Sequence, residues 1–141
     1  MQTTGPGSNG LVWEVHDAMA IQYAFHEEGQ TLVVTASGFD ESLDEVMEYG
    51  RSVLEACQRL GVRCLLCLEQ NLEYRLSTTD TYTAAEALAK HAPQIGKAAL
   101  VVNAGYAEDV QFWENVVVNR GLTVRVFCDE ADARHWLDGD T

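Results

Sequence analysis

The side chains of this sequence best suited to catalysis at neutral pH are its thiols and imidazoles. A Cys–His enzyme needs an exposed thiolate with an imidazole in reach, and Cys128 and His135, seven residues apart, come nearest to that arrangement. No GxGxxG, P-loop or GxSxG sequence accompanies them. We therefore predict that the protein is not an enzyme and assign no catalytic residue. The thiols and imidazoles considered are Cys57, Cys64, Cys67, Cys128, His16, His26, His91 and His135.

Cys64 and Cys67 have the CxxC spacing of zinc and redox motifs. In those motifs the two sulfurs converge from a turn or a helix start, whereas these residues lie in VRCLLCL, an apolar run typical of a buried strand. Side chains three residues apart on a strand point to opposite faces. Neither a second CxxC nor a histidine at finger spacing follows. We interpret these cysteines as core thiols, and we predict no metal and no cofactor.

A polar loop is predicted over residues 69–80, within LEQNLEYRLSTTD, between an apolar run and a predicted helix, where an α/β domain usually keeps its functional groups. Ser77 stands at the helix start, where a phosphate would meet free backbone N–H groups. Asp80 and Glu69 already place negative charge nearby, and a capping serine without any switching role is common. We interpret Ser77 as a cap and leave its phosphorylation open. The predicted partner or switch loop comprises Tyr74, Arg75, Ser77, Thr78 and Thr79.

The N-terminal part of the chain has the alternating pattern of strands. Residues 11–25 alternate between apolar and polar side chains with a break at Asp17, so they form either one long bent strand or two short ones. A turn over residues 27–30 leads into a second strand over residues 31–37, which Gly38 ends. These segments predict an antiparallel hairpin.

A long amphipathic helix is predicted next. Its apolar residues recur at spacings of three and four up to Leu60. We expect Asp40 to cap its start and Gly61 to close its end. Gly50 lies on the apolar stripe, which would let a neighbouring element approach closely.

The rest of the chain alternates strands and helices. Residues 62–68 and 98–104 are apolar on both faces, which is typical of central parallel strands. We predict an α/β fold in the order ββαβαβαβα, with a mixed, mostly parallel sheet, an N-terminal antiparallel hairpin and four helices. It forms a single domain over residues 11–138 after a flexible tail over residues 1–10. The remaining elements are helices at 77–92, 107–120 and 129–137 and a half-exposed strand at 122–128.

This element order resembles the STAS domain, the SpoIIAA-like fold of anti-sigma-factor antagonists, in its bacterial branch of small stand-alone proteins. The resemblance covers about residues 11 to 138. Its most specific piece is NRGLTVRVFCDEADARHWL (119–137): a glycine, a strand ending in VRVF, an Asp-capped turn and a Trp-Leu pair. YTAAEALAKHAPQIGKAALVV and LVVTASG fit as well. The resemblance implies a SpoIIAA-like fold and a regulatory or interaction role.

The phosphorylation site of signalling STAS domains has no counterpart here. In those domains the loop after the first central strand carries an Asp-Ser pair followed closely by glycine, and a partner kinase phosphorylates the serine. The corresponding segment of this chain has neither Asp-Ser nor glycine. We do not assign the modification to Ser77 on this resemblance.

Composition restricts the partners of the protein. Nine Lys and Arg stand against 22 Asp and Glu, a formal net charge of −13. Nucleic acids and anionic membranes attract basic surfaces, so we expect binding to neither. No apolar run approaches the about 20 residues that span a bilayer, and residues 1–10 lack the features of a signal peptide. We predict a cytoplasmic protein without membrane insertion.

We prefer the hypothesis of an interaction module. Folds of this type expose residues 70–90 to partners, and side chains such as Tyr74 and Arg75 are of the kinds that anchor interfaces. In the predicted helix at 107–120, Phe112 and Val118 lie off the inward stripe. An apolar surface there would support a protein partner or a homodimer.

The alternative is a protein that binds a small apolar ligand. The branch that this chain resembles is also likened to CRAL-TRIO lipid-binding domains, which share the topology of sheet and helices. Such a ligand is expected near the carboxyl edge of the sheet. Tyr82 and Trp113 also fit ordinary core positions at helical spacing, and that interpretation stays open. The predicted lining residues are Tyr74, Tyr82, Tyr106, Phe112 and Trp113.

Overall fold

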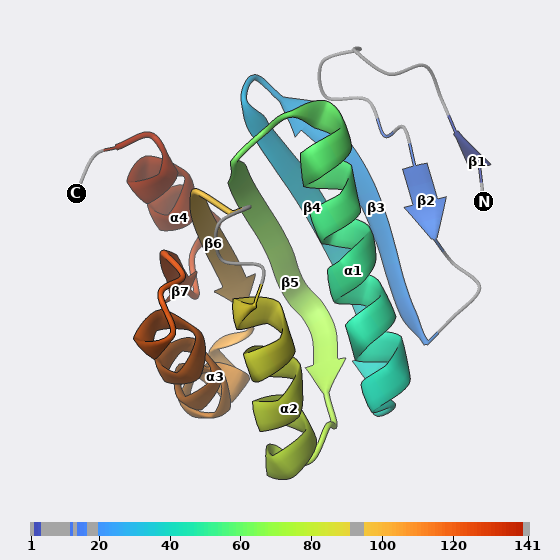
Figure 1. The fold of residues 1–141 in the computed structure, drawn as a ribbon, viewed down its shortest axis with the longest axis vertical. Coiled ribbons are helices and arrows are strands. Elements are labelled where there is room, and N and C mark those ends of the chain that lie inside the picture. The colour runs from blue at the N-terminus through green and yellow to red at the C-terminus, as the bar shows by residue number, and fades with distance from the viewer. Residues whose placement is uncertain (1, 4–11, 13, 17–19, 91–94, 140–141) are drawn as a thin grey trace.

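A single sheet organises the described part of the chain, residues 2–3, 12, 14–16, 20–90 and 95–139 of a computed structural model. Its seven strands follow one another in sequence order, antiparallel from β1 to β4 and parallel from β4 to β7 (Figure 1). This confirms the predicted mixed α/β class. The strands are β1 (Gln2–Thr3), β2 (Glu14–His16), β3 (Ile21–Glu28), β4 (Thr31–Asp40), β5 (Cys64–Tyr74), β6 (Lys97–Val102) and β7 (Val124–Phe127). The helices are α1 (Leu43–Leu60), α2 (Thr78–Ala89), α3 (Ala107–Asn119), α4 (Glu130–Leu137) and the short 3₁₀ helix η2 (Ala104–Tyr106).

The alternating N-terminal segment consists of two strands, β2 and β3. They pair antiparallel, with Glu14 opposite Phe25. The predicted break at Asp17 lies outside the described residues. Residues 2–3, which belong to the tail predicted to be flexible, pair with β2 as strand β1. The remainder of that tail lies outside the described residues.

The hairpin of β3 and β4 contains a glycine that permits a close backbone contact. Gly38 has φ +91°, and a Cβ atom there would lie 2.1 Å from the carbonyl oxygen of Ala20. The N–H of Phe39 donates to that oxygen at 3.2 Å. Strand β4 continues through Gly38 to Asp40, so the prediction that Gly38 ends the strand is wrong. The glycine instead lets the backbone of Ala20, just before β3, lie in close contact with β4.

Helix α1 begins after Ser42, whose hydroxyl accepts a hydrogen bond from the backbone N–H of Glu45 at 3.3 Å. The prediction that Asp40 caps this helix is wrong. Asp40 is the last residue of β4, and its carboxylate accepts hydrogen bonds from two backbone N–H groups just after β5, at 2.6 and 3.0 Å. The carboxylate thus ties the carboxyl ends of two parallel strands together. Gly61 closes the helix in the left-handed conformation, as predicted.

Strands β5 and β6 lie side by side at the centre of the sheet, as the two fully apolar runs predict. Strand β5 is longer than expected, because it pairs with β4 as far as Tyr74 opposite Asp40. The prediction of a loop beginning at Glu69 is therefore wrong up to Tyr74. Leu72 is buried between exposed polar neighbours, so this half of the strand has one face in the core and one in solvent.

The core has one layer on each side of the sheet (Figure 1). Helices α1, α2 and α3 cover one face, and Phe25, Leu32 and Leu65 belong to the large buried cluster beneath them. Helix α4 packs on the other face. Its buried neighbours there are Val33, Leu66, Ala99 and Val101.

The C-terminal half agrees with the predicted order of elements. Asp129 caps α4, accepting hydrogen bonds from the backbone N–H groups two and three residues further along at 2.7 and 3.2 Å. The described part of α2 ends at Ala89, and the predicted stop at Pro93 lies outside the described residues. In the described part of the chain, no helix combines the length and the apolar character needed to cross a bilayer.

Candidate functional site

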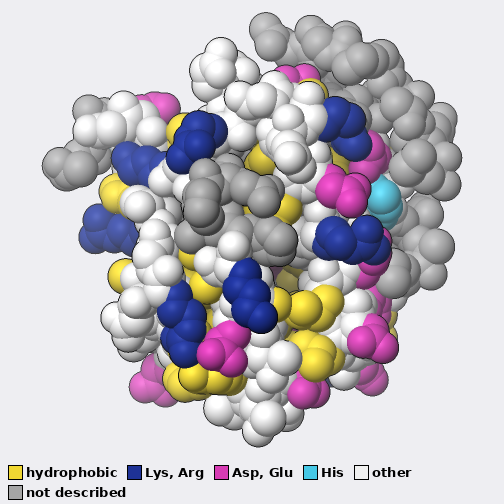
Figure 2. Space-filling model, viewed as in Figure 1, with side chains coloured by type: hydrophobic (Ala, Val, Ile, Leu, Met, Phe, Trp, Pro, Cys, Tyr) yellow, Lys and Arg dark blue, Asp and Glu magenta, His cyan; other side chains and the backbone are white. Residues whose placement is uncertain are grey.

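A cavity of about 900 Å³ lies between helices α1, α2 and α3 and the sheet face that they cover. Its walls include Val46, Leu54, Leu88 and Trp113. Figure 2 shows hydrophobic side chains at the surface between α1 and α2. Ligand pockets in proteins commonly measure about 300–1,000 Å³. The space therefore has the size of a small-molecule site.

A buried carboxylate, that of Glu69, lies on the floor of this cavity. The residue is 7% exposed. Its Oε2 accepts a hydrogen bond from the hydroxyl of Tyr49 on α1 at 2.7 Å, and its Oε1 accepts one from the hydroxyl of Tyr74 at 2.5 Å. Strand geometry places Glu69 on the same face as Cys67, two residues before it, which also lines the cavity. We call Cys67, Glu69, Tyr49 and Tyr74 the Glu69 cluster.

Burial raises the pKa values of the ionisable groups around Glu69. The pKa of Glu69 itself is raised because burial removes water from its carboxylate; repulsion from Asp40 adds to this, and the two tyrosine hydrogen bonds oppose it. Burial also raises the pKa of Asp40. The pKa values of Tyr49, Tyr74 and Cys67 are raised first by burial and then by the nearby charge of Glu69. The phenols and the thiol therefore stay neutral near pH 7.

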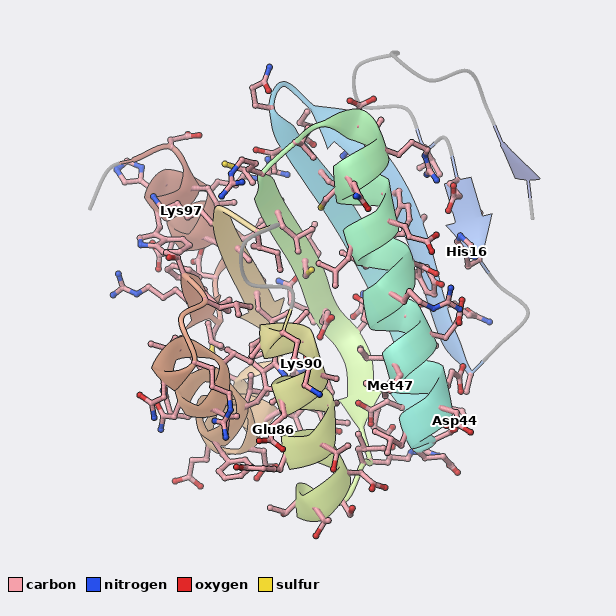
Figure 3. All side chains as sticks on the ribbon, in the orientation of Figure 1. His16, Asp44, Met47, Glu86, Lys90 and Lys97 are labelled. Carbon is pink, nitrogen blue, oxygen red and sulfur yellow. The ribbon has the colours of Figure 1, made fainter. Side chains whose placement is uncertain are left out.

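The described lining of the cavity is strongly acidic. Arg51 is its one basic residue, and the guanidinium already bonds Glu48 and Glu55, the latter at 3.4 Å. Figure 3 shows Asp44 and Met47, two of the lining residues, at the N-terminal end of α1. The acidic lining residues are Asp40, Asp44, Glu48, Glu55, Glu69, Glu108 and Asp109.

The residues predicted to line a pocket separate into two groups. Tyr74, Phe112 and Trp113 line the cavity, and Trp113 also packs against the main core. Tyr82 and Tyr106 are not among its described lining residues. Tyr82 is 38% exposed on α2, so it is not the core residue of the competing interpretation. Tyr106 packs edge to face on Tyr74, with ring centroids 5.1 Å apart.

The residues of the predicted partner or switch loop lie at the junction of β5 and α2. Arg75 is exposed, and its Nε donates to the carboxylate of Glu73 at 2.6 Å. The hydroxyl of Ser77 accepts a hydrogen bond from the backbone N–H three residues further along at 3.1 Å, which makes it the N-cap of α2. Thr78 and Thr79 are exposed in the first turn. Tyr74 of the same predicted loop belongs instead to the Glu69 cluster.

The thiols differ in exposure. Cys57 is buried, and burial raises its pKa to about 11. Cys64 and Cys67 are half-buried. Cys128 is exposed just before α4, whereas His135 is exposed in the last turn of that helix, about 8 Å along its axis from the first turn. Among the residues that the structure describes, no group of three or more His, Cys, Asp or Glu side chains is arranged to hold a metal ion.

Two histidines bond carboxylates on their own strands. Nε2 of His16 lies 2.6 Å from Glu14, and the imidazole stacks on the ring of Tyr23 with centroids 4.5 Å apart. Nε2 of His26 lies 2.7 Å from Glu28. His91 lies outside the described residues. The two described pairs sit on the antiparallel part of the sheet and do not line the cavity.

A second surface feature lies where α2 and α3 meet. Arg120 donates to the hydroxyl of Tyr82 at 2.8 Å and to the carboxylate of Glu86 at 3.0 Å. The rings of Tyr82 and Phe112 lie 6.5 Å apart, and Val118 is 44% exposed. We call Tyr82, Phe112, Val118 and Arg120 the α2–α3 patch.

The Glu69 cluster and its cavity are what sequence reasoning missed. The available signals were a charged residue directly after the apolar run VRCLLCL, and Tyr49 three residues after Val46 on the apolar stripe of α1. Placing Glu69 in a loop concealed the first signal, because a loop acid is expected to face solvent. The cavity itself has no sequence signal, since its volume depends on the spacing of the helices over the sheet.

No family model and no curated protein matches this sequence. One similar solved structure is that of an uncharacterised protein from the DUF3478 family with a SpoIIAA-like fold, from Shewanella loihica. The match covers 92% of this chain and 98% of that chain, with 20% sequence identity and a TM-score of 0.52. An identity this low compares backbones and says nothing of function. The chain therefore has the SpoIIAA-like fold that its resemblance to STAS domains implies.

Proposed function

We propose that the protein is a regulatory or protein-interaction module without enzymatic activity, and that the α2–α3 patch is the surface that contacts its partner. The observation that carries this proposal is the exposure of three large apolar side chains on adjacent helices. Tyr82, Phe112 and Val118 are 38%, 40% and 44% exposed. Tyr82 and Phe112 lie against each other across the two helices, and Val118, six residues further along α3, adds exposed apolar surface towards the C-terminal end of that helix. Exposed apolar surface of this kind is typical of interaction sites.

The chemistry of the patch supports this role. Interface hot spots are enriched in tyrosine and arginine, and Arg120 holds Tyr82 by a hydrogen bond while its guanidinium lies 5.4 Å from the centre of the ring. Two side chains held in place lose little freedom when a partner binds. The patch also has a polar rim, because Glu86 pairs with Arg120.

Val118 allows a test that leaves the rest of the structure intact. It is exposed in the last turn of α3 and is not a described lining residue of the cavity. We expect Val118→Arg to abolish retention of the partner in a quantitative capture from native lysate, and to abolish any self-association seen by sedimentation velocity. Asn119→Arg is the matched control, since it adds the same charge at the next exposed position.

The capture experiment has a clear negative outcome. The α2–α3 patch is not an interface if Val118→Arg captures the same proteins as the wild type and Asn119→Arg, and if its sedimentation is unchanged. A specific partner that both variants retain would place the interface elsewhere on the fold. Self-association that only Val118→Arg disrupts would identify the partner as a second copy of this chain.

The alternative hypothesis, a protein that binds a small apolar ligand as CRAL-TRIO domains do, is not favoured, since the description of the Shewanella protein names no ligand. We keep the interaction hypothesis as the proposed function.

A further inference from the structure

The hydrogen-bonding capacity of the cavity floor is one-sided. The hydroxyls of Tyr49 and Tyr74 each donate their single proton to the carboxylate of Glu69. A phenol oxygen that has donated its proton retains only acceptor capacity, and a carboxylate offers about four acceptor positions. When Glu69 is ionised, the Glu69 cluster presents acceptors only, apart from the weak S–H group of Cys67. A ligand group that reaches this floor must donate hydrogen bonds.

The charge of the lining has the same direction. Among the described lining residues, seven are acidic and one is an arginine, and that arginine is bound to two of the acids. The chain as a whole carries a formal charge of −13. An anionic ligand would meet repulsion at the rim and no strong donor at the floor, whereas a cation would be attracted over the whole approach.

The side walls of the cavity suit a ligand with an apolar body and a cationic group. Val46, Leu54 and Leu88 give aliphatic contact, and the cavity volume of about 900 Å³ leaves room for a molecule of two fused rings with a short chain. The aromatic rings of Tyr49, Tyr74 and Trp113 also line the space. Aromatic faces attract ammonium groups, most strongly where water is excluded.

We propose that the cavity binds a small amphipathic cation, with an ammonium head held at Glu69 and an apolar body lying between α1, α2 and α3. An ammonium group has three donors and no acceptor, which matches the acceptor-only floor. It also supplies an oppositely charged partner for the Glu69 carboxylate, whose hydrogen-bond partners are two neutral phenols. This site is separate from the α2–α3 patch, with Phe112 as the one residue that the two share.

Two fluorescent probes of equal body and opposite charge test the proposal on the whole protein. Dansylcadaverine carries a primary ammonium head, and dansyl-6-aminohexanoate carries a carboxylate on a chain of similar length. Dansyl emission rises and shifts to the blue in apolar surroundings. We expect saturable binding of dansylcadaverine, at least about tenfold tighter than binding of the anionic probe, as for loss of a charge-assisted hydrogen bond.

Three variants locate the binding. Glu69→Gln should weaken dansylcadaverine by about tenfold or more, whereas Glu73→Gln, an exposed carboxylate on the same strand outside the lining, should leave it unchanged within about twofold. Gly50→Leu should block both probes, because a Cβ at Gly50 has open space around it and the leucine would fill the cavity. Val118→Arg should have no effect on either probe.

The proposal fails if the anionic probe binds wild type as tightly as the cationic one, or if neither probe saturates. It also fails if folded Glu69→Gln, checked by circular dichroism, binds dansylcadaverine like the wild type. Should that variant not fold, the contrast between the probes on wild-type protein and their exclusion by Gly50→Leu still decide the matter. Since Val118→Arg tests the patch alone, the two proposals fail independently.

Discussion

Glu69 stands between the apolar first half of β5 and its polar second half, yet its side chain is buried. The cost of burying its charge is reduced by two tyrosine hydroxyls, one from α1 and one from the end of its own strand. A hydrogen bond to a charged group contributes about 1.5–3 kcal/mol, yet the raised pKa shows that removal from water outweighs both bonds. The protein therefore loses stability to keep a carboxylate at this place, as is common at functional sites.

The stability cost of Glu69 gives a prediction with a definite sign. Because its pKa is raised on folding, the folded protein holds this proton at pH values where the unfolded chain has lost it. Its contribution to stability therefore decreases as the pH rises through that window. We expect Glu69→Gln to stabilise the protein at pH 8, on the order of 1 kcal/mol, with a gain that shrinks as the pH falls.

Urea denaturation of the wild type and Glu69→Gln across this pH range measures the gain. Glu73→Gln is the control, since that carboxylate is exposed and its pairing with Arg75 is worth little. Equal stability of Glu69→Gln and wild type at every pH would show that the folded and unfolded states bind the proton alike. Comparing the variants cancels the opposite contribution of Glu28, whose pKa is lowered by Arg134.

At the scale of elements, two glycines show how differently the same residue is used. Gly50 lies in the middle of α1, and a Cβ there would meet nothing within 4 Å. The prediction that Gly50 admits a closely packed neighbour is wrong, because the space beside it belongs to the cavity. Gly38 lies in β4 at φ +91°, with the Ala20 carbonyl oxygen 2.1 Å from the Cβ position.

The same substitution at these two glycines is expected to have opposite effects. Gly50→Ala should stabilise the protein by about 0.5–1 kcal/mol, because alanine lowers the entropy lost on forming a helix. Gly38→Ala should destabilise it by more than about 1 kcal/mol, through the clash and the left-handed backbone. Chemical denaturation of both variants checks the pair. A destabilising Gly50→Ala would mean that the neighbouring helices lie closer than the structure shows.

The N-cap of α2 separates a structural role of Ser77 from a switching role. Its hydroxyl accepts the hydrogen bond that caps this helix start, from the backbone N–H of Asp80. We expect Ser77→Ala to cost about 1 kcal/mol and Ser77→Asp to cost little, because aspartate caps equally well. Thr79→Ala, two residues further along in the first turn of α2, is the control and should leave the free energy of unfolding nearly unchanged. If Ser77→Ala is as stable as the wild type, the cap does not explain the serine, and a modification role gains weight.

The order of the elements could be predicted because it depends on local patterns, whereas the end of β5 could not. The runs 62–68 and 98–104 are apolar on both faces, and that alone places them at the centre of the sheet. From Glu69 onward β5 becomes polar on one face, and only its long partner β4 keeps it extended. Likewise, Asp40 stands where the sequence suggests a helix cap, but its carboxylate instead accepts hydrogen bonds from two backbone N–H groups just after β5.

At the scale of the whole molecule, the cavity and the net charge are connected. Helix α1 contacts β4 and α2, and α2 contacts α3, so the three helices arch over β5 without filling the space beneath them. No pattern in one segment predicts this volume, because it arises from distances between three elements. The acids on α1 and α3 that surround it belong to the excess of acidic residues visible in the sequence. Composition thus predicts the sign of the potential but not its place.

The net charge of −13 also predicts how the whole fold responds to salt. Salt screens two opposing effects. Repulsion among the excess acids destabilises the compact state, and salt weakens this repulsion. Salt also weakens stabilising surface ion pairs, such as that of Arg134 with Glu28 at 2.6 Å. Exposed pairs contribute about 0.2–1 kcal/mol each, whereas the repulsion acts among all 22 acids, which outnumber the bases by more than two to one.

We therefore expect the melting temperature to rise by a few degrees, roughly 1 kcal/mol, between about 0.01 M and about 0.1 M NaCl, where the screening length falls from about 30 Å to about 10 Å. Asp138→Lys is the matched variant, since it replaces a negative charge by a positive one at an exposed site just after α4 and so changes the net charge by two units. At low salt this variant should melt at a higher temperature than the wild type, because its net charge is smaller and because a cation is favourable at a helix C-terminus. Its melting temperature should also change less with added salt, because there is less repulsion to screen. Thermal denaturation at both salt concentrations measures the difference. A melting temperature that falls with salt would show that the ion pairs outweigh the repulsion among the excess acids.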